Sequence, residues 1–277
     1  MKKTILSALA VVVLAACGQT PEEKVKAFDE TVEAMEKEYY AMRDSLSSDA
    51  DAWEAYYETF IEEYINFNFD NAKKNLDNEV AVHALLNLRG FLTDEESAEI
   101  LNNLSAEMLE NETVQALKKG LDARMETAEG KMFKDFTVNS VVGYTRSIPA
   151  EPVYAEVKLS DYVGKGKYIL LDFWSPWCGP CRMEMPNIKA VYDKYKGDQF
   201  DVVSIAVWEK KPVEVTIETA EKLQMTWNQI NNAGREAAEI YGVEAIPHII
   251  LFGPDGTILK RGLHGAEIEE VVSQYVK

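Results

Sequence analysis

Residues 170–186, LLDFWSPWCGPCRMEMP, constrain the fold of this chain more than any other segment, because a strand and a helix must meet there within a few residues. The segment begins inside a continuous apolar run, KYILLDFW, which is typical of a strand buried on both faces of a parallel sheet. A helix is expected from about Pro180 to Tyr195, since proline is tolerated in the first helical turn. Cys178 and Cys181 therefore lie where a buried strand passes into a helix.

The rest of residues 129–277 alternates between strand-like and helix-like patterns. After two short strands within 133–162 and the strand of the cysteine segment, we expect a strand at 200–207, a helix within 213–224, a strand at 226–230 and a helix at 234–241. A Pro-Asp-Gly turn then joins two strands within 248–263, and a helix closes the chain at 266–276. This order predicts an α/β domain with a mixed central sheet and helices on both faces.

Residues 23–128 show the alternating spacing of 3 and 4 that apolar residues have in amphipathic helices. Helices are expected near 25–46, 53–65, 79–88, 93–104 and 109–125, and Thr93 with Glu96 fits a capping box. Five such helices with short connections predict an all-α helical bundle. We interpret the apolar stripes as core, and His83 as structural because no other ligand stands at metal-binding spacing.

The two regions differ in charge. Residues 21–126 hold 26 acidic and 10 basic side chains, whereas residues 127–277 hold 21 and 17, and the whole chain has a formal charge of −18. An acidic surface repels phosphate backbones and anionic headgroups, so we exclude nucleic-acid binding. Beyond the N-terminus no segment reaches 18 uninterrupted apolar residues, and no transmembrane helix is expected.

The first sixteen residues are expected to be a lipoprotein signal peptide. Two lysines precede an apolar run over 5–16 that is too short to span a bilayer. The sequence LAAC at 14–17 resembles the lipobox of bacterial lipoproteins, which implies lipidation of Cys17 and a short tether over 17–22. The protein is then expected in the cell envelope, lipid-anchored and facing the periplasm, on the outer rather than the inner membrane. A plain secretory signal with an incidental cysteine is the alternative.

Export leaves Cys178 and Cys181 as a pair in a compartment where disulfides persist. A zinc site needs about four ligands, and one pair with three scattered histidines does not supply them. A structural disulfide closing so small a loop removes little chain entropy. A redox pair fits best, with Cys178 as the nucleophile activated by the helix N-terminus and Cys181 as the resolving thiol. No metal, and no cofactor besides this dithiol/disulfide, is expected.

Asp172 is the one carboxylate in the apolar strand ahead of the cysteines. Burial of a carboxylate should raise its pKa toward neutrality. Lying beneath Cys181, such an acid can accept and return the proton of the resolving thiol. An exposed aspartate at a strand edge is the alternative interpretation.

The quoted segment resembles the active site of thioredoxin, and the wider pattern resembles the TlpA/ResA type of membrane-tethered thiol-disulfide oxidoreductases. The shared stretches are FKDFTVN, VKLSDYVGKGKYILLDFW and IYGVEAIPHIILFGPDGTIL, over about residues 130–277. The resemblance implies a thioredoxin fold in which Pro247 is a cis-proline facing the disulfide. It also implies a substrate-binding surface formed by Trp177, Gly179, Pro180 and Ile246. The chain departs from the family at His248, where threonine is usual, and at Trp208.

The same resemblance implies an enzyme that reduces disulfides of exported proteins by thiolate attack and resolution. Its partners would be disulfide-containing exported proteins and an upstream thiol electron donor. Two alternatives stay open: an oxidant or isomerase on the same scaffold, and a partner-binding lipoprotein in which the helical domain has the main role. The redox direction depends on thiolate stabilisation, which the sequence does not give.

Overall fold

The computed structural model describes residues 18–277, so the expected signal peptide and Cys17 lie outside the described residues. The chain divides into two compact units, 18–115 and 116–277. The division falls inside helix α6 (Glu112–Glu126), earlier than the boundary at 128/129 that the change of sequence pattern indicates. The apolar spacing of α6 is helical throughout, and it therefore does not reveal that the second half of this helix packs with the C-terminal unit.

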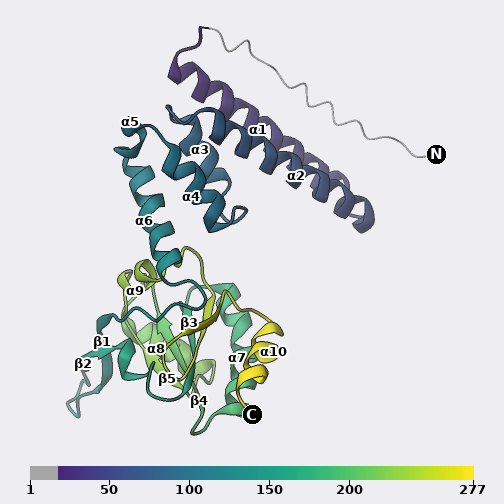
Figure 1. Ribbon diagram of the computed structural model, residues 1–277. Coiled ribbons are helices and arrows are strands. Elements are labelled where there is room, and N and C mark those ends of the chain that lie inside the picture. Colours follow the sequence, from purple (N-terminus) through teal and green to yellow (C-terminus); the bar gives the residue numbers. More distant parts are fainter. Residues whose placement is uncertain (1–17) are drawn as a thin grey trace. The chain divides into compact units, whose positions relative to one another are not determined.

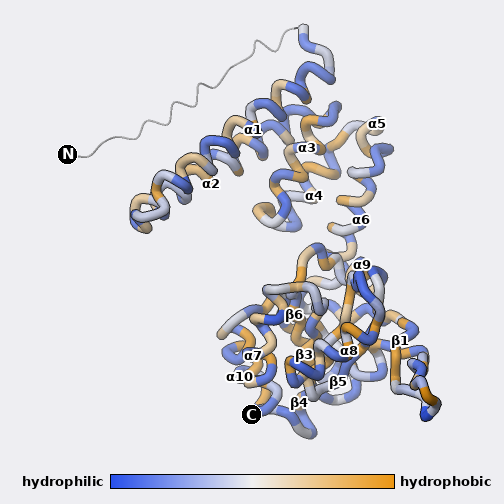
Figure 2. Tube along the Cα trace, turned by 180° about the vertical axis from the view of Figure 1, so that it is seen from behind, coloured by the Kyte–Doolittle hydropathy of each residue, from blue (hydrophilic) through white to orange (hydrophobic). Residues whose placement is uncertain are grey.

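The N-terminal unit is all helical, as its periodicity predicts (Figure 1). Its helices are α1 (Pro21–Ser45), α2 (Ala50–Lys74), α3 (Val80–Asn87), α4 (Asp94–Asn103) and α5 (Ala106–Leu109). The long helices α1 and α2 lie side by side, and the hydropathy colours alternate along both of them (Figure 2). Thr20 caps α1 in a capping box with Glu23, so residues 21 and 22 of the expected tether are already helical.

The core of this unit forms where the apolar stripes meet. Phe28, Val32 and Met35 of α1 are buried, as are Phe60 and Tyr64 of α2. The capping box of Thr93 and Glu96 at the start of α4 is present as expected. His83 of α3 lies with Nδ1 2.8 Å from Oδ1 of Asp29 in α1, which supports its structural interpretation.

The C-terminal unit contains a five-stranded mixed sheet with the order β5-β4-β3-β6-β7. Strand β3 (Tyr168–Trp174) is central and pairs parallel with β4 (Phe200–Ala206) and antiparallel with β6 (His248–Phe252). The outer strands are β5 (Asn228–Ile230), parallel to β4, and β7 (Ile258–Arg261), antiparallel to β6. A separate hairpin consists of β1 (Thr137–Tyr144) and β2 (Pro152–Lys158). The expected strands are therefore present, and the sheet is mixed as predicted.

Helices cover both faces of this sheet (Figure 1). One core contains buried residues of α7 (Gly179–Tyr195), α10 (Glu267–Tyr275) and Ala220 of α8 (Val213–Lys222). The other core contains residues of α9 (Glu236–Ile240), of β1 and of the short 3₁₀ helix Leu159–Asp161. Every β3 residue from Ile169 to Trp174 is buried, since both faces are covered. Among residues 18–277 no helix is both long enough and apolar enough to cross a membrane.

The end of α6 is bonded into the C-terminal unit. Arg261 of β7 donates to the carbonyl oxygen and to Oγ1 of Thr127, both at 2.8 Å, and to the carbonyl oxygen of Tyr241 at 2.7 Å. Nη1 of Arg124 lies 3.0 Å from Oε1 of Glu244. These contacts satisfy carbonyl groups that follow the last helical turn. They explain physically why the unit boundary lies ahead of Thr127 rather than after it.

Candidate functional site

Cys178 and Cys181 are joined by a disulfide at the junction of β3 and α7, where the sequence places a redox pair. Strand β3 ends at Trp174 and α7 begins at Gly179, so Cys178 is the N-cap residue of the helix. Cys181 is fully buried, and Cys178 is 4% exposed. The next two residues after Cys178, Gly179 and Pro180, are exposed. Cys178 is therefore the cysteine next to the surface, and Cys181 lies within the core.

The start of α7 provides electrostatic stabilisation at Cys178. Its Sγ accepts the backbone N–H of Cys181 at 3.1 Å, in the place that a capping oxygen normally takes. Free N–H groups and the helix dipole at this end favour negative charge. A cysteine at a helix N-terminus is in general more acidic than a free cysteine. The arrangement can therefore produce a thiolate at Cys178.

Asp172 is fully buried in β3, which supports the buried interpretation over the exposed one. Its Oδ2 accepts a hydrogen bond from Oγ of Ser204 at 2.8 Å. The Ser204 Oγ in turn accepts a hydrogen bond from Nε1 of Trp227 at 2.8 Å. Its Oδ1 has no hydrogen-bond partner within the described part of the chain. Burial raises the pKa of Asp172 to about 7, against the lowering effect of the Ser204 hydrogen bond. Because alternate strand residues share a face, Asp172 lies on the same side of β3 as Trp174, which packs in one core with Cys181.

Glu184, one turn after Cys181, is a second acid near this site. It is 9% exposed, and its Oε1 accepts from the backbone N–H of Gly265 at 2.9 Å and from Nδ2 of Asn187 at 2.7 Å. Its negative charge adds to the rise in the pKa of Asp172. The site thus holds two acids, and the pKa of one of them, Asp172, is raised close to physiological pH.

The Ile246–Pro247 peptide bond is cis, as the resemblance implies. The carbonyl oxygen of Ile246 lies 3.6 Å from Sγ of Cys178, so this loop borders the disulfide directly. Strand β6 starts at the next residue, His248. A backbone segment at this position is suited to pairing with an extended chain that presents a cysteine to Cys178.

Trp177 is 44% exposed beside Cys178. Its Nε1 donates to the carbonyl oxygen of Trp208 at 3.0 Å, and Nζ of Lys210 lies 4.3 Å from its ring centroid. Trp208 has φ 55°, a left-handed conformation that is uncommon for a bulky residue, and its N–H donates to the carbonyl oxygen of Gly234 at 2.9 Å. The loop after β4 is thus fixed against the active-site segment.

His248 does not face the disulfide. Its position in β6 shares a face with Ile250 and Phe252, which belong to the core on the opposite side of the sheet from Cys178. Its Nε2 lies 3.4 Å from Nη2 of Arg261. Burial, together with the charge of Arg261, lowers the pKa of His248 to about 4, so this histidine is neutral at pH 7.

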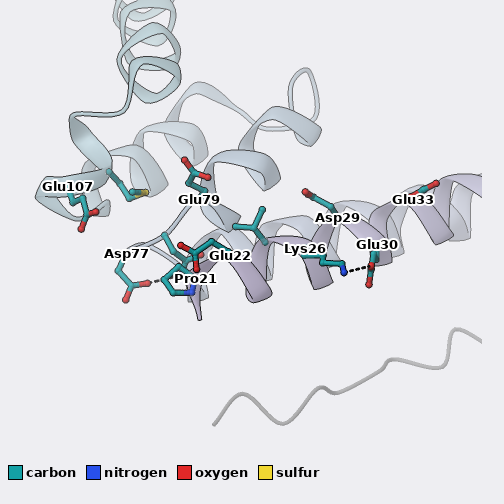
Figure 3. Close-up of a pocket in the computed structure, with 12 residues that line it drawn as sticks. Pro21, Glu22, Lys26, Asp29, Glu30, Glu33, Asp77, Glu79 and Glu107 are labelled. Atoms are coloured by element: carbon teal, nitrogen blue, oxygen red, sulfur yellow. Dashed lines mark hydrogen bonds and ion pairs between the residues drawn. The ribbon is translucent and has the colours of Figure 1, made fainter. Parts of the chain in front are cut away.

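A hollow lies in the helical unit, and no cysteine is among the described residues that line it (Figure 3). Its lining includes seven carboxylates, one lysine and the apolar Val25 and Met108; the carboxylates belong to Glu22, Asp29, Glu30, Glu33, Asp77, Glu79 and Glu107. No group of three or more His, Cys, Asp or Glu in residues 18–277 is arranged to hold a metal ion. The hollow carries no redox group.

Sequence reasoning missed three participants of the site: Ser204, Trp227 and Glu184. A lone serine in the apolar strand FDVVSIAV is a signal for a buried polar partner, because a hydroxyl there needs a hydrogen bond. Glu184 follows Cys181 at a spacing of 3, which puts both on one face of the helix. Trp227 gives no such signal, since only the parallel pairing of β4 with β5 brings its indole to Ser204.

Comparisons with known proteins find similar sequences for the part of the chain that holds the disulfide. Residues 130–261 match the model of the AhpC/TSA family. The thiol-disulfide oxidoreductase ResA of Bacillus cereus is 26% identical over 163 residues, which cover 58% of this chain and 84% of that protein. ResA of Bacillus subtilis is 27% identical over 121 residues, which cover 43% of this chain and 64% of that protein.

Among solved structures, the thioredoxin domain of a Bacteroides vulgatus thiol-disulfide oxidoreductase is 27% identical and covers 54% of this chain and 99% of that domain, with a TM-score of 0.45. A thiol:disulfide interchange protein from Bacteroides sp. is 28% identical, and the match covers 55% of this chain and 92% of that protein, with a TM-score of 0.45. The sequence matches lie in the part of the chain that holds the disulfide, β3 and the cis-proline loop. Residues 130–261 are therefore similar to the AhpC/TSA family and to thiol-disulfide oxidoreductases of the TlpA/ResA type, and the protein is a thiol-disulfide oxidoreductase with a thioredoxin fold.

Proposed function

We propose that the protein reduces disulfides of exported proteins through the Cys178–Cys181 pair. The observation that carries this proposal is the position of Cys178 as the N-cap of α7, with its Sγ 3.1 Å from the N–H of Cys181. A thiolate formed there is stabilised before substrate binds. The exposed Trp177, Gly179 and Pro180 and the backbone of Ile246 then form the surface that receives the substrate.

The reaction proceeds in two exchange steps. The Cys178 thiolate attacks one sulfur of the substrate disulfide, which forms a mixed disulfide and releases the other substrate sulfur as a thiolate. Cys181 then loses its proton to Asp172 and attacks Sγ of Cys178, which releases the second substrate thiol. The protein ends as the Cys178–Cys181 disulfide, two electrons having passed to the substrate. A thiol electron donor must return it to the dithiol.

The environment of Asp172 supports its part in the second step. A carboxyl group with a pKa of about 7 can take a proton from Cys181 and return it in the next cycle. Asp172 lies on the same side of β3 as the core that contains Cys181, and both residues are fully buried.

A Cys181→Ser variant tests the proposal by stopping the reaction at the mixed disulfide. Expressed in the native host, it should hold a substrate on Cys178 that is released by dithiothreitol and identified by mass spectrometry. A Cys178→Ser variant serves as the control, because it cannot form this adduct. Equal recovery of partners from the two variants would refute the enzymatic role of Cys178.

The direction of exchange separates a reductase from an oxidant or isomerase on the same scaffold. The proposal expects a low reduction potential for the pair, near that of thioredoxin and well below about −120 mV, the value typical of a strong oxidant. Equilibration with glutathione buffers of known ratio, followed by tryptophan fluorescence, measures it. A potential at the oxidant end would assign the protein to disulfide formation instead.

We also propose that the chain is anchored in the cell envelope through lipid on Cys17, on the outer membrane and facing the periplasm. The LAAC sequence at 14–17 supports this. Several acyl chains bind a membrane far more firmly than one. In a Cys17→Ser variant the protein should move from the membrane fraction to the soluble fraction; retention in the membrane fraction would exclude the anchor.

The helical unit is proposed to hold partners for the redox domain. Its separate core and its acidic hollow support a role apart from the chemistry (Figure 3). The Cys181→Ser trap, repeated in a chain without residues 18–111, should capture fewer of the native partners. If the captured set is unchanged, the helical unit has no part in partner choice.

A further inference from the structure

Three segments border the disulfide. Residues 175–184 contain it, residues 207–212 receive the Trp177 indole hydrogen bond at Trp208, and residues 244–248 bring the Ile246 carbonyl to Cys178. Together they contain three carboxylates and three permanently charged cations. The carboxylates have partners within the protein, whereas the cations face solvent.

Each of the three carboxylates is bonded within the protein, although Glu244 is exposed. Glu184 is buried and accepts a backbone N–H at 2.9 Å. Glu209 accepts the backbone N–H of Asn232 at 2.8 Å, and burial raises its pKa. Glu244 is paired with Arg124, whose Nη1 lies 3.0 Å from its Oε1. None of the three presents a free negative charge to an approaching partner.

The three cations, in contrast, face solvent. Arg182, Lys210 and Lys211 are exposed, and none of them has an ion pair with a residue in 18–277. Lys210 is held over the exposed Trp177 ring, with Nζ 4.3 Å from the centroid. Trp177 in turn donates to the Trp208 carbonyl oxygen, so the ammonium group lies over the ring of the residue that directly precedes Cys178.

We propose that this cationic border, Arg182, Lys210 and Lys211, selects partner proteins that carry acidic residues next to the reacting disulfide. The inference rests on the proposed function and names the class of substrate for it. The chain as a whole has a charge of −18, but at physiological salt charges act over only about 8 to 10 Å. An acidic residue adjacent to the substrate cysteine therefore responds to the border and not to the distant acidic surface.

Two cyclic peptides test the proposal, each closed by one disulfide and identical except that the residues flanking one cysteine are both Asp or both Lys. The second-order rate constant for oxidation of the reduced full chain is measured with each peptide at about 0.1 M and about 1 M salt, where the screening length falls from about 10 Å to about 3 Å. The Asp peptide should react about 10-fold faster at the lower salt, the low end of electrostatic steering effects. The ratio of the two rates should approach 1 at the higher salt.

Three variants assign this preference to the border. Lys210→Gln should lower the Asp-to-Lys rate ratio, Lys210→Arg should preserve it, and Lys222→Gln, which removes an exposed lysine from α8, should leave it unchanged. Equal rates with both peptides, or a ratio that Lys210→Gln does not alter, would overturn the inference while leaving the enzymatic function intact. Failure of both peptides to react at all would instead overturn the proposed function, and the inference with it.

Discussion

Asp172 is an ionisable side chain in an apolar environment, and the proposed proton transfer from Cys181 depends on it. Its strand is otherwise apolar, and burial is the main cause that raises its pKa to about 7. Only Oδ2 has a partner, Ser204, and Oδ1 has none among residues 18–277. A carboxylate so poorly bonded destabilises the fold when it is ionised.

Replacing Asp172 with Asn should therefore stabilise the protein at alkaline pH. For an acid whose folded pKa is raised from 3.8, the stability is fully present below pH 3.8 and is lost as the pH rises through about 7. At pH 8 the free energy of unfolding of the oxidised variant should exceed that of the wild type by up to about 4 kcal/mol, at about 1.4 kcal/mol per pKa unit. Urea titrations at pH 5 and pH 8 measure this, and an identical pH dependence in both proteins would contradict it.

His248 should have little influence on the thiolate, although it follows the cis-proline. Its side chain is on the face of the sheet opposite to Cys178, next to Arg261. In a His248→Thr variant, the pKa of Cys178 should equal that of the wild type, while the free energy of unfolding falls by about 1 kcal/mol through the lost contact. The pH dependence of iodoacetamide labelling measures the first, and a shifted labelling profile would show that His248 influences Cys178.

At this scale the sequence identifies the residues of the disulfide site and not their supporting partners. Cys178, Cys181 and Asp172 stand out because each conflicts with its local pattern. The orientation of His248 depends on the register of β6 against β3, in which His248 lies opposite Phe173. The register depends on pairing with a strand that is distant in sequence. The alternation of residues along β6 alone does not decide on which face of the sheet His248 lies.

Helix α6 is the element whose role differs most from expectation. Its sequence continues the amphipathic pattern of the preceding helices, yet residues from Ala116 onward pack with the C-terminal unit. Arg261, more than a hundred residues later in the chain, supplies the bonds to Thr127. Such non-local contacts leave no trace in periodicity, so the boundary could not be placed from sequence, while the type of each long element could.

Arg261→Met should destabilise the C-terminal unit by about 2–5 kcal/mol, because carbonyl groups of Thr127 and Tyr241 lose charged donors. Thermal unfolding followed by circular dichroism measures the loss. Arg146→Met, in the loop between β1 and β2, is the matched control, since the described residues offer Arg146 no ion pair. Equal stability of the two variants would show that the Arg261 bonds contribute nothing net.

The unit boundary itself can be tested with two fragments. A chain of residues 112–277 keeps all of α6, whereas a chain of residues 129–277 follows the boundary that the sequence pattern indicates and removes Thr127. The longer fragment should unfold at a higher urea concentration, because only it retains the Thr127 acceptors of Arg261. Coincident unfolding curves would place the true boundary at 128/129.

On the scale of the whole molecule, every residue of the disulfide site lies in the unit of residues 116–277. A chain lacking residues 18–111 should therefore reduce a small uncharged disulfide, such as 2-hydroxyethyl disulfide, at the rate of the full chain. Stopped-flow measurement of tryptophan fluorescence follows this reaction. A large loss of rate in a fragment that remains folded by circular dichroism would assign chemistry to the helical unit.

The continuity of α6 through the unit boundary limits how these two parts can be recombined. A flexible connector permits domains to be shuffled by cutting at any point along it, but here the join is a single helix with residues in both units. A chimera that receives this redox domain from residue 129 onward would lose the Thr127 acceptors that Arg261 binds, whereas a transfer that begins ahead of α6 would keep them.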